Sequence, residues 1–173
     1  MKVQTLARLS MLTAVALALG YVESFIPVAP GIPGIKLGLA NTVLLYSLYL
    51  LDVKSSVLLM LFKVLLSGLL YAGFSATMFS LGGGVLSLLM MILTKKFIKN
   101  ISIVGVSVIG AVFHNVGQLA VAATVVSTVA LLSYLPVLLV SAVITGVLTG
   151  IAANVSIRAL SHGKIGGGGE AKK

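Results

Sequence analysis

The residues of this chain best suited to chemistry are polar side chains placed within long apolar segments. Lys63 follows Lys54 by nine residues, or about 13 Å of helix, and lies in a run that carries no other charge. A charge at that depth must be satisfied inside the protein. Lys63 therefore either binds an anionic or carbonyl-bearing ligand, or pairs with a carboxylate or helix-end carbonyls for packing. One helical face combines Ser56, Met60, Lys63, Ser67 and Tyr71.

A second polar cluster lies in the sequence AVFHNVGQLAVAA. His114 and Gln118 are four residues apart and share a helix face, whereas Asn115 is rotated from them by about 100°. Three such groups so close together favour a ligand pocket, with interhelical hydrogen bonding as the alternative. A metal site is not expected, because the only other histidine, His162, lies near the C-terminus.

Further polar residues flank the segment 27–36, PVAPGIPGIK, which its prolines and glycines predict to be a loop. Glu23 ends the first predicted helix, and Lys36 and Asn41 open the second on the same side. A pair of Glu23 with Lys36 or Lys63 would be purely structural. Alternatively, one outward-facing pocket beneath the loop would collect all the candidate ligand-binding residues, with Phe113 and Tyr71 stacking on a ring of the ligand. These candidates are Glu23, Lys36, Asn41, Lys63, Tyr71, His114, Asn115 and Gln118.

The composition is typical of an integral membrane protein. Of the 173 residues, 59% are hydrophobic and only 9% are charged, whereas a soluble domain carries about 25% charged residues. Three acidic residues and no cysteine exclude an Asp-rich magnesium site, a glycosidase carboxylate pair, a Walker-type ATPase and thiolate metal centres. The sequence contains no recognisable catalytic set of a nucleophile, a general base and a group that orients the base. We therefore expect that the protein is not an enzyme and that it binds no cofactor or metal ion.

The uncharged runs predict an all-α protein with six transmembrane helices. The spans lie near residues 9–26, 37–51, 55–72, 79–94, 102–131 and 136–157. The small-residue segment 72–77 predicts a turn, and Pro136 opens the last helix. Residues 1–160 would form the transmembrane domain, and the glycine-rich residues 161–173 a disordered cytoplasmic tail.

The basic residues predict the orientation of these helices. With the N-terminus inside, ten of the twelve Lys and Arg residues are cytoplasmic, Lys36 is external and Lys63 lies in the membrane. This bias accounts for the net charge of +9 without nucleic-acid binding and requires an even number of spans. Both termini would then lie in the cytoplasm of a prokaryote. The first segment resembles a signal peptide, but its apolar run is longer than a signal core.

Small residues predict close helix contacts. Ala14 and Ala18 give the first helix a small-xxx-small surface, and glycines recur at 82–84, 146 and 150. Such residues let backbones approach each other within a bundle. On the first helix they could instead form a docking face for another membrane protein.

Three stretches resemble the Gx transporter family, which often carries the label heptaprenyl diphosphate synthase component I. They are KLGLAN at 36–41, FSLGGGVL at 79–86 and GVSVIGAVFHNVGQ at 105–118. That family is similar in turn to the substrate-binding S components of energy-coupling factor (ECF) transporters. The resemblance implies a six-helix S-component fold with an outward pocket. It also implies that Ala14 and Ala18 pack against a transmembrane coupling subunit, which works with two ATPase subunits.

These observations predict the S subunit of an ECF-type importer in the cytoplasmic membrane. Its solute would be vitamin-like, a flavin, or a quinone or isoprenoid precursor. The alternative is a non-catalytic membrane accessory or scaffold for prenyl-lipid, quinone or electron-transfer enzymes. The label's synthase activity is not expected, because Asp52 is the only aspartate and an Asp-rich motif is needed to hold magnesium diphosphate.

Overall fold

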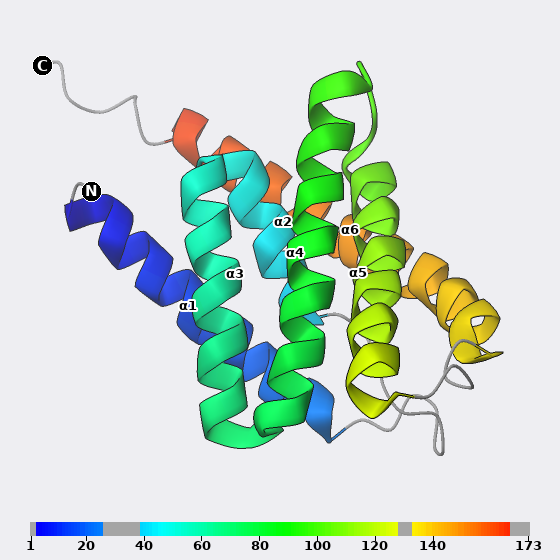
Figure 1. The fold of residues 1–173 in the computed structure, drawn as a ribbon. Coiled ribbons are helices and arrows are strands. Elements are labelled where there is room, and N and C mark those ends of the chain that lie inside the picture. The colour runs from blue at the N-terminus through cyan, green and yellow to red at the C-terminus, as the bar shows by residue number, and fades with distance from the viewer. Residues whose placement is uncertain (1–2, 26–38, 128–132, 167–173) are drawn as a thin grey trace, which may run out of the picture.

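The computed structural model describes residues 3–25, 39–127 and 133–166, and these residues form an all-helical bundle without strands (Figure 1). Helices α4 and α5 lie side by side, and α6 crosses obliquely behind them in this view, while α1 crosses behind α3. The first turn of α1 and the last turns of α6 lie at the same end. The elements are α1 (Val3–Ser24), α2 (Leu39–Leu50), α3 (Val53–Ser67), the π-helical turn η1 (Gly68–Ala72), α4 (Phe74–Phe97), α5 (Ile103–Val126) and α6 (Leu135–Gly166).

Five of these helices are long and apolar enough to cross a membrane, as expected of a multi-pass membrane protein. They are α1, α3 with η1, α4, α5 and α6. Helix α2 has 12 residues and is about 18 Å long, less than the ~30 Å of a hydrocarbon core. Large apolar side chains such as Val140, Leu148 and Val155 are exposed on the outside of α6. The surface therefore suits lipid rather than water.

The short helix α2 is the most enclosed element, packed against α1, α3 and α6. Ser47 and Ser56, both fully buried, join α2 to α3 by a hydrogen bond of 3.0 Å between their hydroxyl oxygens. Lys95 of α4 donates to the carbonyl oxygen of Leu48 at 2.7 Å, and its Nζ lies 4.3 Å from the centre of the Tyr49 ring. These contacts hold the C-terminal end of α2 in place.

Glycines allow α4, α5 and α6 to pack closely. A Cβ added at Gly117 on α5 would lie 2.6 Å from the carbonyl oxygen of Gly82 on α4. One added at Gly146 on α6 would lie 2.7 Å from the Cα of Val108 on α5. Real Cβ atoms essentially never come within 3.0 Å of such atoms. Close packing is therefore the role of these glycines.

The predicted turn at 72–77 is wrong in extent. Only Gly73, with a φ of +79°, separates η1 from α4, which begins at Phe74 rather than 79. The amide and hydroxyl of Thr77 both donate to the carbonyl oxygen of Gly73, at 3.1 and 2.7 Å. One residue in a conformation that glycine adopts without strain is enough to reverse the chain, so residues 74–77 remain helical.

Several helices extend beyond the predicted apolar spans. Helix α1 begins at Val3 rather than 9, α4 ends at Phe97 rather than 94, and α6 is helical as far as Gly166, although we expected 161–173 to be disordered. Charged side chains limit the apolar part of a helix, but the backbone hydrogen bonds of the helix can continue past them. Basic residues are also favourable at a helix C-terminus. Helix α5 ends earlier than 131, because Ser127 is left-handed. The predicted loop 27–36 and residues 167–173 lie outside the described residues.

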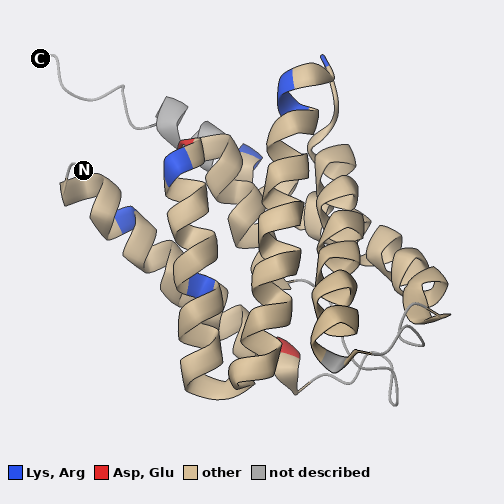
Figure 2. Cartoon of the chain, viewed as in Figure 1, with Lys and Arg blue, Asp and Glu red and all other residues tan. Residues whose placement is uncertain are grey.

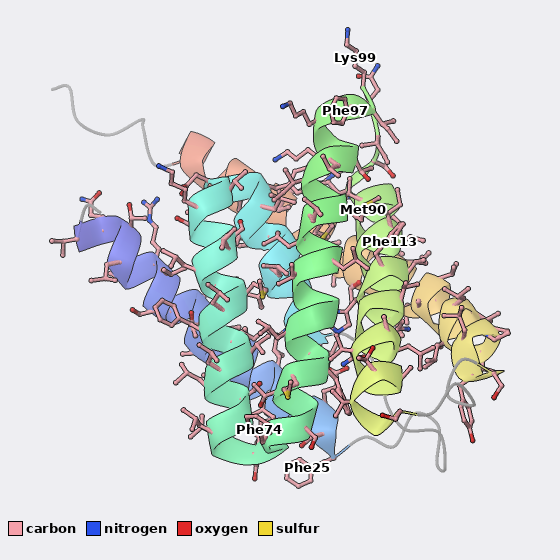
Figure 3. All side chains as sticks on the ribbon, in the orientation of Figure 1. Phe25, Phe74, Met90, Phe97, Lys99 and Phe113 are labelled. Atoms are coloured by element: carbon pink, nitrogen blue, oxygen red, sulfur yellow. The ribbon has the colours of Figure 1, made fainter. Side chains whose placement is uncertain are left out.

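The charged residues distinguish the two ends of the bundle. Figure 2 shows Lys and Arg gathered where α3 begins and α4 ends, and a further blue band on α3, the helix that carries Lys63. In Figure 3, Phe97 and Lys99 lie at this basic end, and Phe25 and Phe74 at the opposite end. The side chains of Phe25 and Phe74 are exposed. Basic residues thus distinguish the two ends of the bundle, whereas exposed phenylalanine side chains lie at both.

Candidate functional site

A cavity with a volume of about 90 Å³ lies among the helices and is lined by residues from all six α-helices and η1. Leu44, Leu45 and Met60 supply part of its apolar wall. The polar lining residues are Glu23, Asn41, Lys63, Ser67, Tyr71, Ser80, Ser87, Ser107, His114, Asn115, Gln118, Thr145 and Thr149. The cavity therefore combines many polar groups with an apolar wall, inside a bundle that is otherwise apolar.

The cavity brings together seven of the eight candidate ligand-binding residues, all except Lys36, which lies outside the described residues. Phe113, which we expected to stack on a ligand ring, is not among the lining residues, so that prediction is wrong. Figure 3 labels it on α5. It lies one residue before His114, and neighbouring residues on a helix point in directions about 100° apart.

Lys63 reaches Asn41 across the cavity wall between α3 and α2. Its Nζ donates a hydrogen bond of 2.7 Å to Oδ1 of Asn41. The ammonium group has three donors, and the Asn41 oxygen accepts from one of them. Asn41 turns its amide oxygen to the ammonium group, which orients the Lys63 side chain. A charge held in this way half-way along a membrane helix can attract the anionic or carbonyl end of a solute.

Tyr71 is presented by the π-helical turn η1, a type of irregularity that is frequent at functional sites. Its hydroxyl donates to the carbonyl oxygen of Leu17 on α1, at a long 3.5 Å. A Cβ added at Gly20 would lie 2.7 Å from that hydroxyl, so the ring fits against α1 only because residue 20 is glycine. Glu23, one turn further along α1, is only 5% exposed and interacts electrostatically with Tyr71.

His114, Asn115 and Gln118 do not all have the same role. The Asn115 amide nitrogen donates to the carbonyl oxygen of Leu138 on α6 at 2.9 Å, which is the interhelical bond considered as an alternative. A Cβ added at Gly83 on α4 would lie 2.7 Å from the His114 carbonyl oxygen and 3.0 Å from Cγ of Gln118. Glycine at this position lets His114 and Gln118 lie directly against α4.

The sequence matches the family described as Heptaprenyl diphosphate synthase component I over residues 12–156. The chain belongs to this family. A search of curated proteins and a search of solved structures each found no match. The matched range includes every residue that lines the cavity, from Gly20 on α1 to Thr149 on α6. In this component I protein, the cavity is therefore part of the family domain.

The sequence reasoning missed a group of hydroxyls that lines the component I cavity. Ser107 on α5 and Thr149 on α6 share a hydrogen bond of 2.9 Å between their hydroxyl oxygens. Ser87 on α4 and Thr145 on α6 are also buried there. The four-residue spacing of Thr145 and Thr149 was a signal that they share a face. It was weak because Thr hydroxyls satisfy themselves on their own helix, as both do here.

The described lining suits hydrogen bonding and charge pairing rather than metal binding. Glu23 and Lys63 are its charged side chains. Within the described ranges, no group of three His, Asp or Glu side chains could hold a metal ion. The arrangement can bind and orient a polar solute.

Proposed function

We propose that this protein is the substrate-binding S subunit of an ECF-type importer for a small solute, such as a vitamin-like compound, a flavin, or a quinone or isoprenoid precursor. The observation that carries the proposal is a cavity to which each of the six α-helices contributes polar side chains. Polar groups are expensive to bury in a membrane domain, so a lining of this kind is explained by a solute that uses it. In this role the protein binds its solute and is not an enzyme.

The proposed topology has six spans with both termini in the cytoplasm of a prokaryotic cell. The basic end of the bundle (Figure 2) is the end expected to face the cytoplasm. Helix α2, with 12 residues, is the shortest of the six proposed spans. Glu23 and Tyr71 then lie toward the outer side, from which a solute would enter.

The proposed partners are a transmembrane coupling subunit and two ATPase subunits, because this chain has no ATP-binding motif of its own. Ala14 and Ala18 are exposed on α1 and offer a small-residue surface on which another helix can pack. We expect Ala14→Leu with Ala18→Leu to abolish copurification of the coupling subunit while solute affinity is unchanged. Val140→Leu with Val155→Leu, exposed on α6, is the matched control. Loss of solute binding with intact assembly would reverse these assignments.

Native mass spectrometry of the gently purified protein tests the proposed function. A discrete non-lipid adduct should be present in the wild type and absent from Lys63→Ala. Lys54→Ala, on the same helix but exposed outside the cavity, is the matched control and should keep the adduct. Equal unfolding temperatures would establish that both variants fold. An adduct that survives unchanged in Lys63→Ala would make Lys63 a structural residue.

A second candidate function is that of a non-catalytic membrane accessory in a prenyl diphosphate synthase system. The family description, which names a component I, favours it and implies a second component as partner. In that case the spectrum would contain only lipid, and a polyprenyl synthase or another prenyl-lipid enzyme would copurify. That result would replace the importer as the function of this protein.

A further inference from the structure

We infer that the cavity selects a compact polar solute that carries no net charge, a class that includes neutral amides and hydroxy compounds and amino-acid-like zwitterions. This inference rests on the proposed solute-binding function and deepens it. It distinguishes among the solutes proposed above, because flavin phosphates and prenyl diphosphates are multiply charged.

The charges of the described lining residues cancel. By formal charge at pH 7, Lys63 contributes one positive charge, Glu23 contributes one negative charge, and His114 is counted as neutral. Both charged side chains lie in a low-dielectric bundle, where a charge without a compensating partner is strongly unfavourable. A solute with a net charge would bring an additional, uncompensated charge into this site. A neutral or zwitterionic solute would not.

Phosphorylated solutes fit the lining poorly. Proteins bind phosphates with several cationic groups or with helix N-termini. The described part of the cavity offers one ammonium group, on Lys63, and this group already donates to Asn41 at 2.7 Å. The buried Glu23 carboxylate on the same lining would repel a phosphate. The site therefore disfavours a diphosphate more strongly than a monoanion.

The hydroxyl groups suit the neutral functional groups of such a solute. Ser87, Ser107, Thr145 and Thr149 are all buried and line the cavity. A hydroxyl can accept a hydrogen bond even when its own proton is engaged, so it can complement the N–H groups of an amide or an ammonium without contributing charge. Thr145 and Thr149 donate to carbonyl oxygens of α6, and Ser107 shares a hydrogen bond with Thr149. These groups therefore offer a solute mainly acceptor oxygens on the walls formed by α5 and α6.

The volume limits the solute to a small molecule. The cavity measures about 90 Å³, less than the ~150 Å³ of an engineered protein cavity that accommodates benzene. A flavin ring system is larger than benzene and does not fit the cavity in this conformation. A solute the size of alanine or lactamide is compact enough for a cavity of this volume.

Four solutes of nearly the same size and shape test the charge selectivity of the full-length protein in lipid nanodiscs. Lactamide is neutral, alanine is zwitterionic, lactate is an anion and alaninamide is a cation, and pyrophosphate serves as the multiply charged probe. The readout is the unfolding temperature as a function of probe concentration. Lactamide and alanine should raise it, with apparent affinities about tenfold or more above those of lactate and alaninamide. Pyrophosphate should have no effect beyond that of an equal ionic strength of sodium chloride.

Two cavity variants should shift the preference for charged solutes in opposite directions. Glu23→Gln gives the described lining a net positive charge and should shift the preference to lactate, whereas Lys63→Met should shift it to alaninamide. Lys54→Met is the control and should keep the wild-type order. If either cavity variant fails to fold, the order of probes on the wild-type protein still decides the question.

Stronger binding of lactate, alaninamide or pyrophosphate by the wild-type protein would overturn the inference. So would the absence of a response to all five probes, because the cavity would then not accept solutes of this size. Neither result removes the proposed solute-binding function, which fails separately if no Lys63-dependent adduct is found by mass spectrometry. The two proposals can therefore fail independently.

Discussion

The contact between Gly117 and Gly82 predicts that one added methyl group separates α5 from α4. In Gly117→Ala the new Cβ would lie 2.6 Å from the carbonyl oxygen of Gly82 and 3.0 Å from the Cα of Gly83. The first distance falls 0.4 Å short of the 3.0 Å limit that real Cβ atoms respect. Because the opposing atoms belong to a helix backbone, they cannot rotate away, and the two helices must move apart by at least that amount.

The expected loss of stability follows from two opposing effects. Overpacking of a close interface costs about 1–3 kcal/mol, whereas replacing glycine by alanine within a helix gains roughly 0.5–1 kcal/mol. Gly117→Ala should therefore lower the free energy of unfolding by about 1–2 kcal/mol. It should also weaken solute binding, since His114 and Gln118 lie within one turn of Gly117 and line the cavity.

Gly105→Ala is the matched control on the same helix. Its Cβ would meet only side-chain atoms, with Cγ1 of Ile101 nearest at 3.0 Å, and that side chain can adjust. This variant should be as stable as the wild type or more stable, and should bind solute normally. Denaturant titration in detergent micelles, followed by circular dichroism, measures both variants. Equal stability of Gly117→Ala and the wild type, or an equal loss in Gly105→Ala, would refute the packing argument.

Two further predictions concern α1 and the start of α3. Gly20→Ala places a Cβ 2.7 Å from the Tyr71 hydroxyl and should lower the free energy of unfolding by about 1 kcal/mol. Tyr71→Phe in the same chain removes the clashing oxygen and should restore most of this loss in a thermal unfolding experiment. If the double variant is no more stable than Gly20→Ala, the contact is contradicted. Asp52 caps α3, and the hydrogen bond from the Ser55 hydroxyl lowers the pKa of the carboxyl below its ordinary value. Because the folded-state pKa is the lower one, the stabilisation by the cap is complete above about pH 4 and is lost as the pH falls through the folded-state pKa. Amide exchange in the first turn of α3 should therefore become relatively faster in acid in the wild type, and Asp52→Asn should remove this pH dependence.

Local sequence patterns predicted the helical architecture well because they depend on single segments. Long apolar runs between charges indicated the helices, and Pro136 marked the start of α6, which begins at Leu135. The ends of the helices were less predictable. Lys95 and Lys96 end the apolar run but not α4, since backbone hydrogen bonds continue where the side chains have left the apolar region.

The charged and amide residues of the candidate site could be predicted from the sequence, but its hydroxyl residues could not. Lys63 and Glu23 stand out in the sequence because a charge in an apolar run needs a specific reason. Thr149 does not stand out, since its hydroxyl can bond to its own helix whichever way it faces. Asn115 was recognised as unusual, but its bond to the Leu138 carbonyl depends on how α5 and α6 cross.

By itself, the sequence determined that the chain is an apolar, multi-helix membrane protein of the component I family, and that a few polar residues lie at depth. Only the tertiary structure decided which of these residues meet. Asn41 and Lys63 are 22 residues apart and Ser107 and Thr149 are 42 apart, and no helical periodicity links such positions. Their contacts depend on the rotation and separation of whole helices, which are set where glycine backbones such as those of Gly82 and Gly117 touch.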